Sequence, residues 1–136
     1  MALADIENKL ARLTPVVLSA FRIVVGFLFF LHGTSHLLGW PLASYLRPAG
    51  TLPWWAGIIE FVGGAAIILG LGTRIAAFIA SGAMAVAYFA YHQPDGLLPI
   101  QNNGEASALY SWIFLLLVFT GGGSLSLDQF ITRTKR

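Results

Sequence analysis

The stretch that decides the fold is residues 16–38, which read VVLSAFRIVVGFLFFLHGTSHLL. Its only Lys, Arg, Asp or Glu is Arg22, and the run exceeds the about 20 apolar residues that a helix needs to cross a bilayer. It is also too long for the apolar part of a signal peptide, and no small-residue cleavage site closes it. We therefore predict a membrane-spanning helix here.

Three further apolar runs follow, separated by segments rich in Gly and Pro. They predict spans at roughly 54–71, 75–91 and 106–120. The last is short for a full crossing, so it either extends into the glycines at 121–123 or sits in a thinned bilayer. The predicted fold class is all-α, a bundle of four transmembrane helices.

The composition agrees with a membrane protein. Hydrophobic residues make up 57% of the chain and charged residues 10%, whereas soluble domains carry about 25% charged residues. So few charges cannot cover a water-facing surface, and we expect the lipid bilayer to be the main partner. The net charge of +2 is too small and dispersed to indicate nucleic acid binding, and the absence of cysteine excludes disulfides and thiolate metal ligands.

The chain divides into three parts. Residues 1–15 form a predicted short amphipathic helix on the membrane surface, residues 16–123 the transmembrane domain, and residues 124–136 a basic cytoplasmic tail. Thr14 and Pro15 are typical of a helix start, so we expect the first span to begin there. Apolar residues recur at helical spacing in the first part at Leu3, Ile6, Leu10 and Leu13.

The basic residues predict the orientation. With four spans, one side of the membrane receives most of the Lys and Arg, and the opposite side receives only Arg47. Because basic residues concentrate in cytoplasmic segments, both termini are expected in the cytoplasm, in a multi-pass protein of the inner (plasma) membrane. Trp40, Trp54 and Trp55 then mark the outer interface. The basic side holds Lys9, Arg12, Arg74, Arg133, Lys135 and Arg136.

Polar residues gather in the predicted outer half of the bundle. Ionisable side chains inside a bilayer cost at least about 2.5–3.5 kcal/mol each at mid-depth, so several of them at one level require a reason. The inner half has the intramembrane charge of Arg22 in mid-span. The candidate ligand-binding residues of the outer half are His32, His36, Glu60, Tyr88, His92, Asn103 and Glu105.

Helical spacing predicts that these groups converge. Gly57, Glu60 and Gly64 share one face of the second span, and glycines there would let a neighbouring helix approach and pair with Glu60. A structural explanation also exists for some residues. Glu105 is favoured at a helix N-terminus, and Asn103 with the following glycine is a common turn.

Two kinds of chemistry fit the cluster. A histidine beside a carboxylate in a low-dielectric site can transfer protons near neutral pH, and such groups can hydrogen-bond a quinone or quinol between aromatic walls. His32 and His36 also have the i, i+4 spacing of metal ligands. A metal site would additionally need Glu60, His92 or Glu105 to converge, so we predict no metal or haem and favour a quinone or quinol as the bound cofactor.

Six short stretches follow one another between about residues 20 and 128: FRIVVGFLFFLHG at 21–33, GIIEFVGG at 57–64, GTR at 72–74, AYF at 87–89 with His92, NGE at 103–105 and GSLSLD at 123–128. In their order and spacing, these stretches resemble the DoxX family of membrane proteins.

The resemblance implies a four-helix membrane protein. It also implies a link to quinone-coupled redox processes, because the family is named after a subunit of a thiosulfate:quinone oxidoreductase. One departure concerns the residues after Gly33, where the family often has a Gln-Lys pair and this chain has Thr34, Ser35 and His36. Any role of that lysine is therefore not carried over, and His36 either replaces it or marks a subgroup.

Two functions from different classes remain open. The first is an integral membrane subunit of a quinone-linked oxidoreductase system. The second is a non-catalytic accessory or assembly subunit of a larger membrane complex, in which the polar cluster only locks the bundle. Both expect another membrane or membrane-associated protein as partner. A small transporter is less favoured, because the chain shows no internal repeat.

Overall fold

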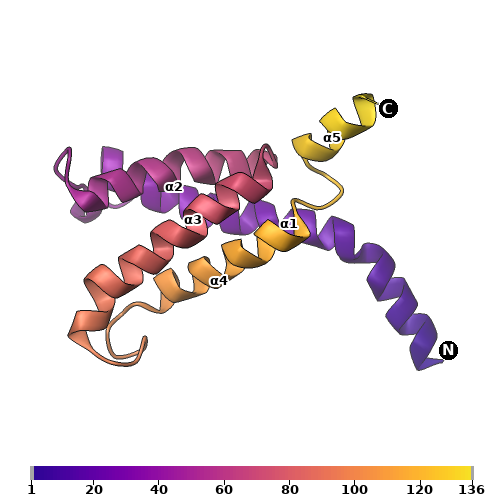
Figure 1. Ribbon diagram of the computed structural model, residues 1–136, viewed down its shortest axis with the longest axis horizontal. Helices are drawn as coiled ribbons and strands as arrows, with labels where there is room; N and C mark the ends of the chain where they lie inside the picture. The colour runs from indigo at the N-terminus through magenta and orange to yellow at the C-terminus, as the bar shows by residue number, and fades with distance from the viewer. Residues whose placement is uncertain (1, 136) are drawn as a thin grey trace.

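The computed structural model describes residues 2–135, and its regular structure is entirely helical (Figure 1). The described residues contain no β-strand, so the predicted all-α class is confirmed, although five α-helices are present rather than four. The elements are α1 Leu3–Leu38, η1 Ala43–Tyr45, α2 Leu52–Leu69, α3 Thr73–Ala87, the π-helical turn η2 Tyr88–His92, η3 Gln93–Asp95, α4 Glu105–Thr120 and α5 Leu127–Thr134.

Helix α1 runs without a break through Pro15, so the expected helix start at Thr14 and Pro15 is wrong. Proline lacks an N–H and removes one helical hydrogen bond, but prolines are tolerated inside membrane helices. The hydroxyl of Thr14 donates to the Leu10 carbonyl (3.4 Å), and that of Ser19 donates to the Pro15 carbonyl (3.1 Å). Figure 1 shows the N-terminal part of α1 bending away from the bundle.

Glycines bring α1 and α2 together over their length. A Cβ added at Gly33 would lie 2.4 Å from the backbone nitrogen of Phe61, and one added at Gly64 would lie 2.9 Å from the Cα of Phe30. Real Cβ atoms do not approach so closely, so both positions require glycine for the observed packing. The helix interface therefore rests on small residues, as is common between membrane helices.

A tight turn joins α2 to α3. Gly70 and Gly72 both have left-handed backbone conformations (φ 67° and 58°), which glycine adopts without the steric cost of a Cβ. At its other end α3 continues into η2 and η3, so the whole helical segment reaches Asp95.

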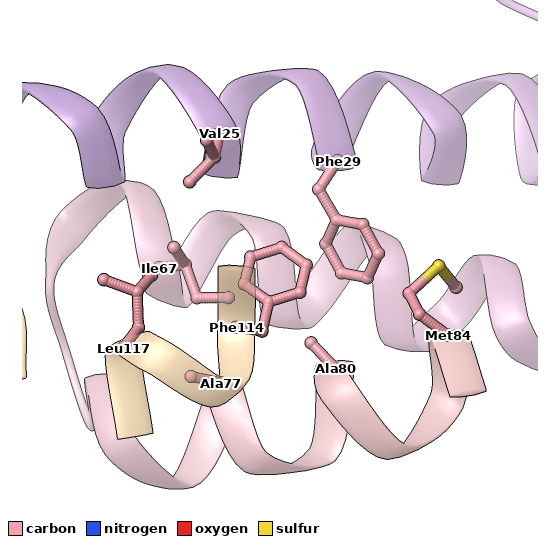
Figure 2. Packing of buried hydrophobic residues seen from close by; sticks show 8 residues of the cluster. All are labelled: Val25, Phe29, Ile67, Ala77, Ala80, Met84, Phe114 and Leu117. Atoms are coloured by element: carbon pink, nitrogen blue, oxygen red, sulfur yellow. The ribbon is translucent and has the colours of Figure 1, made fainter. Parts of the chain in front are cut away.

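The buried core lies where all four long helices meet (Figure 2). Phe29 of α1 and Phe114 of α4 have no exposed surface, and their rings meet edge to face with centroids 4.6 Å apart. Such a pair contributes about 0.5–1.5 kcal/mol beyond its buried area. The remaining core residues are Val25, Ile67, Ala77, Ala80, Met84 and Leu117.

The outer surface of the bundle is apolar, as a bilayer environment requires. Ile75, Trp112 and Phe119 are each more than 70% exposed. Helices α1 and α2 and the segment Thr73–Asp95 are long and apolar enough to cross a membrane. The protein is therefore a membrane protein with lipid-contacting helices.

Helix α4 is apolar but shorter than α1, α2 and the continuous segment Thr73–Asp95. Its 16 residues extend about 24 Å, against about 30 Å for the hydrocarbon core of a bilayer.

The four long helices form two close pairs, α1 with α2 and α3 with α4. Figure 1 shows the pairs meeting near the turn between α2 and α3 and diverging toward the opposite end. That opposite end carries the segments 39–51 and 96–104. The turn between α2 and α3, both chain ends and α5 lie toward the other end, with the N-terminus and α5 on opposite sides of the bundle (Figure 1).

The C-terminal segment 124–136, expected as a basic tail, contains a helix that the sequence did not predict. Ser126 caps α5, because its hydroxyl oxygen accepts a hydrogen bond from the Gln129 N–H (3.3 Å). Arg136, the last residue of the expected tail, lies outside the described residues.

Candidate functional site

A cavity of about 570 Å³ lies between the diverging ends of the two helix pairs. Its size falls in the range of about 300–1,000 Å³ that is typical of small-ligand sites. All four long helices contribute to its walls, together with η1. Its polar and charged side chains are His32, His36, Tyr45, Arg47, Glu60, Tyr91, His92, Asn103, Ser107 and Tyr110.

A close pair of ionisable side chains forms one wall of this cavity. Nδ1 of His36 lies 2.7 Å from Oε2 of Glu60, a distance at which an imidazole N–H donates to a carboxylate oxygen. Only 4% of Glu60 is exposed, and His36 is half-buried. The pair joins α1 to α2, as expected from the glycines near Glu60.

Gly57 makes the room that this pair needs. It lies almost one turn before Glu60, and a Cβ added to it would stand 2.8 Å from the Cβ of His36. A larger residue here would push α1 outward and separate the imidazole from the carboxylate.

Tyrosines surround the two histidines of α1. The ring of Tyr45 stacks on His36, with centroids 6.0 Å apart and planes 19° apart. The ring of Tyr110 on α4 meets His32 edge to face, with centroids 5.9 Å apart. Both tyrosines border the cavity, so polar rings from η1, α1 and α4 face the same space.

The other walls are apolar or aromatic. Phe29 of α1, Ile59 of α2 and Met84 of α3 border the cavity beside the polar group. The cavity therefore combines a few convergent polar side chains with a largely apolar lining, which is typical of sites for small organic ligands.

A second polar network fastens the segment 96–104 beside the cavity. The side-chain amide of Asn102 donates to the Tyr88 hydroxyl (3.2 Å) and to the Gly96 carbonyl (2.9 Å), and its Oδ1 accepts from the Gly104 N–H (2.8 Å). Nδ1 of His92 lies 3.1 Å from the Asn102 carbonyl oxygen. Asn102 is 3% exposed, so this buried amide holds the loop in place.

The structure brings five of the seven predicted site residues to the cavity: His32, His36, Glu60, His92 and Asn103. Tyr88 and Glu105 do not border it. Tyr88 belongs to the Asn102 network, and Glu105 is the exposed first residue of α4, where a carboxylate favours the helix N-terminus.

Arg22 lies at the opposite end of the bundle from Glu60. It is 1% exposed, and its guanidinium donates to the carbonyls of Gly122, Leu125 (2.9 Å) and Ile68 (3.4 Å). Arg22 therefore ties α1 to the end of α2 and to the segment between α4 and α5. The predicted intramembrane charge has a structural role here.

Asp128 completes this end of the structure. Its carboxylate accepts hydrogen bonds from the N–H groups of Gly72 (2.8 Å) and Thr73 (2.9 Å) at the start of α3. Burial alone would raise the pKa of the Asp128 carboxyl. The hydrogen bonds from Thr73 and Gly72 and the positive charge of Arg22 outweigh burial and hold that pKa below its usual value.

Sequence reasoning did not name Tyr45, Tyr110 or Asn102 as site residues. Tyr110 carried a usable signal, because it is one of the few polar side chains on the fourth apolar run. Tyr45 and Asn102 belong to irregular segments, where no periodicity indicates direction. Within residues 2–135, no three His, Asp or Glu side chains are grouped so that they could hold a metal ion.

Comparison with known proteins gives one family and two relatives. The sequence model of the DoxX family matches residues 17–93. A Haemophilus influenzae protein described as "Uncharacterized protein" is 42% identical over 128 residues, covering 90% of this chain and 96% of the relative. The Bacillus subtilis protein named "Putative oxidoreductase CatD" is 27% identical over 119 residues, covering 85% and 87%. No solved structure matches the chain.

Proposed function

Because the chain belongs to the DoxX family, we propose that it is the membrane subunit of an oxidoreductase system and that its cavity binds the head group of a quinone or quinol. Family membership and the name of the Bacillus subtilis relative support the link to an oxidoreductase. The observation that supports quinone binding is the His36–Glu60 pair, which borders a cavity with apolar and aromatic walls.

The residues present fit such a head group. A quinone ring needs flat apolar walls, and its two oxygens need hydrogen-bonding partners. Phe29, Ile59 and Met84 provide apolar walls, while His32 and Tyr110 provide ring N–H and hydroxyl groups on the same cavity. Quinol oxidation releases two electrons and two protons, and the electrons pass to the redox centre of the partner oxidoreductase.

The role of this chain's own side chains is to accept and transfer the protons that the quinol releases. The Glu60 carboxylate can accept a proton from a ligand hydroxyl, and the adjacent His36 imidazole can share or relay it. Only 4% of Glu60 is exposed, so the pair stands in a largely apolar, low-dielectric part of the bundle. A proton held there is close to the loop end of the bundle, so it leaves on that side of the membrane.

The proposal places both termini in the cytoplasm and the protein in the inner membrane. The elements at the bundle end with the chain termini hold five basic residues: Lys9 and Arg12 near the start of α1, Arg74 at the start of α3, and Arg133 and Lys135 at the end of α5. Arg47 borders the cavity at the other end. This asymmetry supports a cytoplasmic location for the basic end. The cavity then faces the outer leaflet, and its protons are released outward.

An accessory subunit without redox chemistry is the second candidate. Helix α4 favours it, because this helix is shorter than the bilayer core and exposes the large side chains of Trp112 and Phe119. A neighbouring subunit packed along α4 would cover these side chains.

The direct test is a binding titration with the protein in lipid nanodiscs, using a tail-less benzoquinone and reading the quenching of tryptophan fluorescence. Glu60→Gln should weaken binding by about tenfold or more, because a hydrogen bond to a charged group contributes about 1.5–3 kcal/mol. Glu105→Gln is the matched control, since this exposed carboxylate lies at the same end of the bundle outside the cavity. Equal affinities for the two variants would exclude Glu60 from the binding site.

A further inference from the structure

The cavity opens to the exterior of the helix bundle between α2 and α3. Trp55 of α2 and Val86 of α3 border the cavity, yet each is 55% exposed. Residues that face a cavity and the exterior at once mark the place where the cavity opens. Figure 1 shows α2 and α3 diverging toward this end.

The exterior at this opening is hydrocarbon rather than water. Val86 lies nine residues, or about two and a half turns, before the end of its membrane-spanning segment at Asp95. The opening therefore extends from the outer interface, where Trp55 lies, down into the bilayer.

The opposite side of the cavity, between α1 and α4, is closed by rings. Phe29 has no exposed surface, and its ring packs against Tyr110 and Phe114, with centroids 5.4 Å and 4.6 Å away. Tyr110 also meets His32 edge to face. These ring contacts close the side of the cavity between α1 and α4, so the exposed lining residues Trp55 and Val86 mark the side between α2 and α3 as the lateral opening.

Small side chains line the cavity on the side between α2 and α3 and leave that side open. Ala83 and Ala87 lie one turn apart on α3, and Ala56 lies on α2; all three border the cavity. The polar pair of His36 and Glu60 stands behind them. The cavity is therefore polar at its inner wall, at His36 and Glu60, and apolar where it opens toward the lipid.

We infer that the cavity's ligand enters sideways from the outer leaflet between α2 and α3, and that it is an amphiphile with a hydrocarbon tail. This inference rests on the proposed function and specifies its substrate class: a quinone or quinol whose head lies at His36 and Glu60 while its tail occupies the opening. A ligand entering from water would instead pass the loop end, where Arg47 and Asn103 border the cavity.

The test compares two probes, a tail-less benzoquinone and a benzoquinone with a long isoprenoid tail, each titrated into nanodiscs holding the full-length protein. Ala87→Phe narrows the opening. Ala90→Phe is the matched control, because Ala90 is exposed on the same helical segment and does not border the cavity. Circular dichroism and size-exclusion elution establish that each variant folds, and Ala83→Leu serves as a milder second blocking variant.

We expect Ala87→Phe to weaken binding of the long-tailed probe by about tenfold, equivalent to about 1.4 kcal/mol, and that of the tail-less probe by less than about threefold. Ala90→Phe should change neither. Equal losses for both probes, or no loss for the long-tailed one, would overturn the lateral opening while leaving head-group binding intact. If the unsubstituted protein binds neither probe, the proposed function fails and this inference falls with it.

Discussion

Nδ1 of His36 on α1 lies 2.7 Å from Oε2 of Glu60 on α2, at a level where glycine removes the side chain that would hold the helices apart. The contact joins two ionisable side chains of neighbouring membrane-spanning helices. It also leaves both groups at the wall of the cavity between the diverging ends of the helix pairs. Packing of the helices and chemistry of the cavity therefore depend on the same pair.

The two side chains should be energetically coupled. His36→Leu alone leaves the buried Glu60 carboxylate without its partner, which costs more than removing both groups. A double-mutant cycle with His36→Leu and Glu60→Leu, measured by unfolding in detergent micelles, should give a coupling free energy of about 1–2 kcal/mol. Single-variant effects that add to within about 0.5 kcal/mol would show that the groups do not interact.

The close approach of α1 and α2 predicts contrasting results for two glycines. Gly33→Ala would place a Cβ 2.4 Å from the Phe61 backbone nitrogen, which only a helix shift relieves, so the free energy of unfolding should fall by about 1–3 kcal/mol. Gly63→Ala meets nothing within 4 Å and should be neutral or stabilising by up to about 1 kcal/mol. Equal thermal stability of the two variants would contradict the observed helix packing.

Asp128 predicts a pH dependence of stability at the end of the bundle opposite the cavity. Its pKa is lower in the folded protein than the usual value of about 3.9, so ionised Asp128 contributes stability that is fully present above that pH. This contribution is lost as the pH falls from about 3.9 through the lower pKa of the folded state. Asp128→Asn should remove that part of the acid dependence, as measured by unfolding between neutral pH and the acid limit. An unchanged profile in the variant would contradict the capping of α3 by this carboxylate.

The absence of cysteine permits a clean test of orientation, since single-cysteine variants carry one label each. Ala49→Cys lies in the exposed segment at the cavity end, and Thr134→Cys lies at the end of α5. On intact cells, a membrane-impermeant maleimide should label the first and not the second, because the basic end is expected in the cytoplasm. Labelling of Thr134→Cys with protection of Ala49→Cys would reverse the orientation.

The membrane-spanning helices could be predicted from the sequence, because long apolar runs and helical spacing of residues indicate them. The apolar runs gave the long helices to within a few residues, and the shared face of Gly57, Glu60 and Gly64 anticipated close packing against a neighbouring helix. The start of α1 could not be placed, because a proline typical of a helix start is also tolerated inside a membrane helix.

The contacts made by irregular segments could not be predicted from the sequence. Asn102 is buried by a loop whose direction no repeat pattern describes, and Tyr45 reaches His36 from the short helix η1. Asp128 bonds the N-terminus of α3 across more than 50 residues of chain, so only the tertiary structure shows it. Glu105 was expected in the cluster because of its side of the membrane, but helix phase points it outward.

The measurement that tests the central claim most directly is mass spectrometry of the protein gently solubilised from its own membrane, reading both the extracted small molecules and the co-purifying polypeptides. The account predicts a retained quinone that is lost in Glu60→Gln and kept in Glu105→Gln, together with an oxidoreductase polypeptide. A constant protein partner with no quinone in the unsubstituted protein would contradict quinone binding, and would assign the His36–Glu60 pair to holding an accessory subunit together.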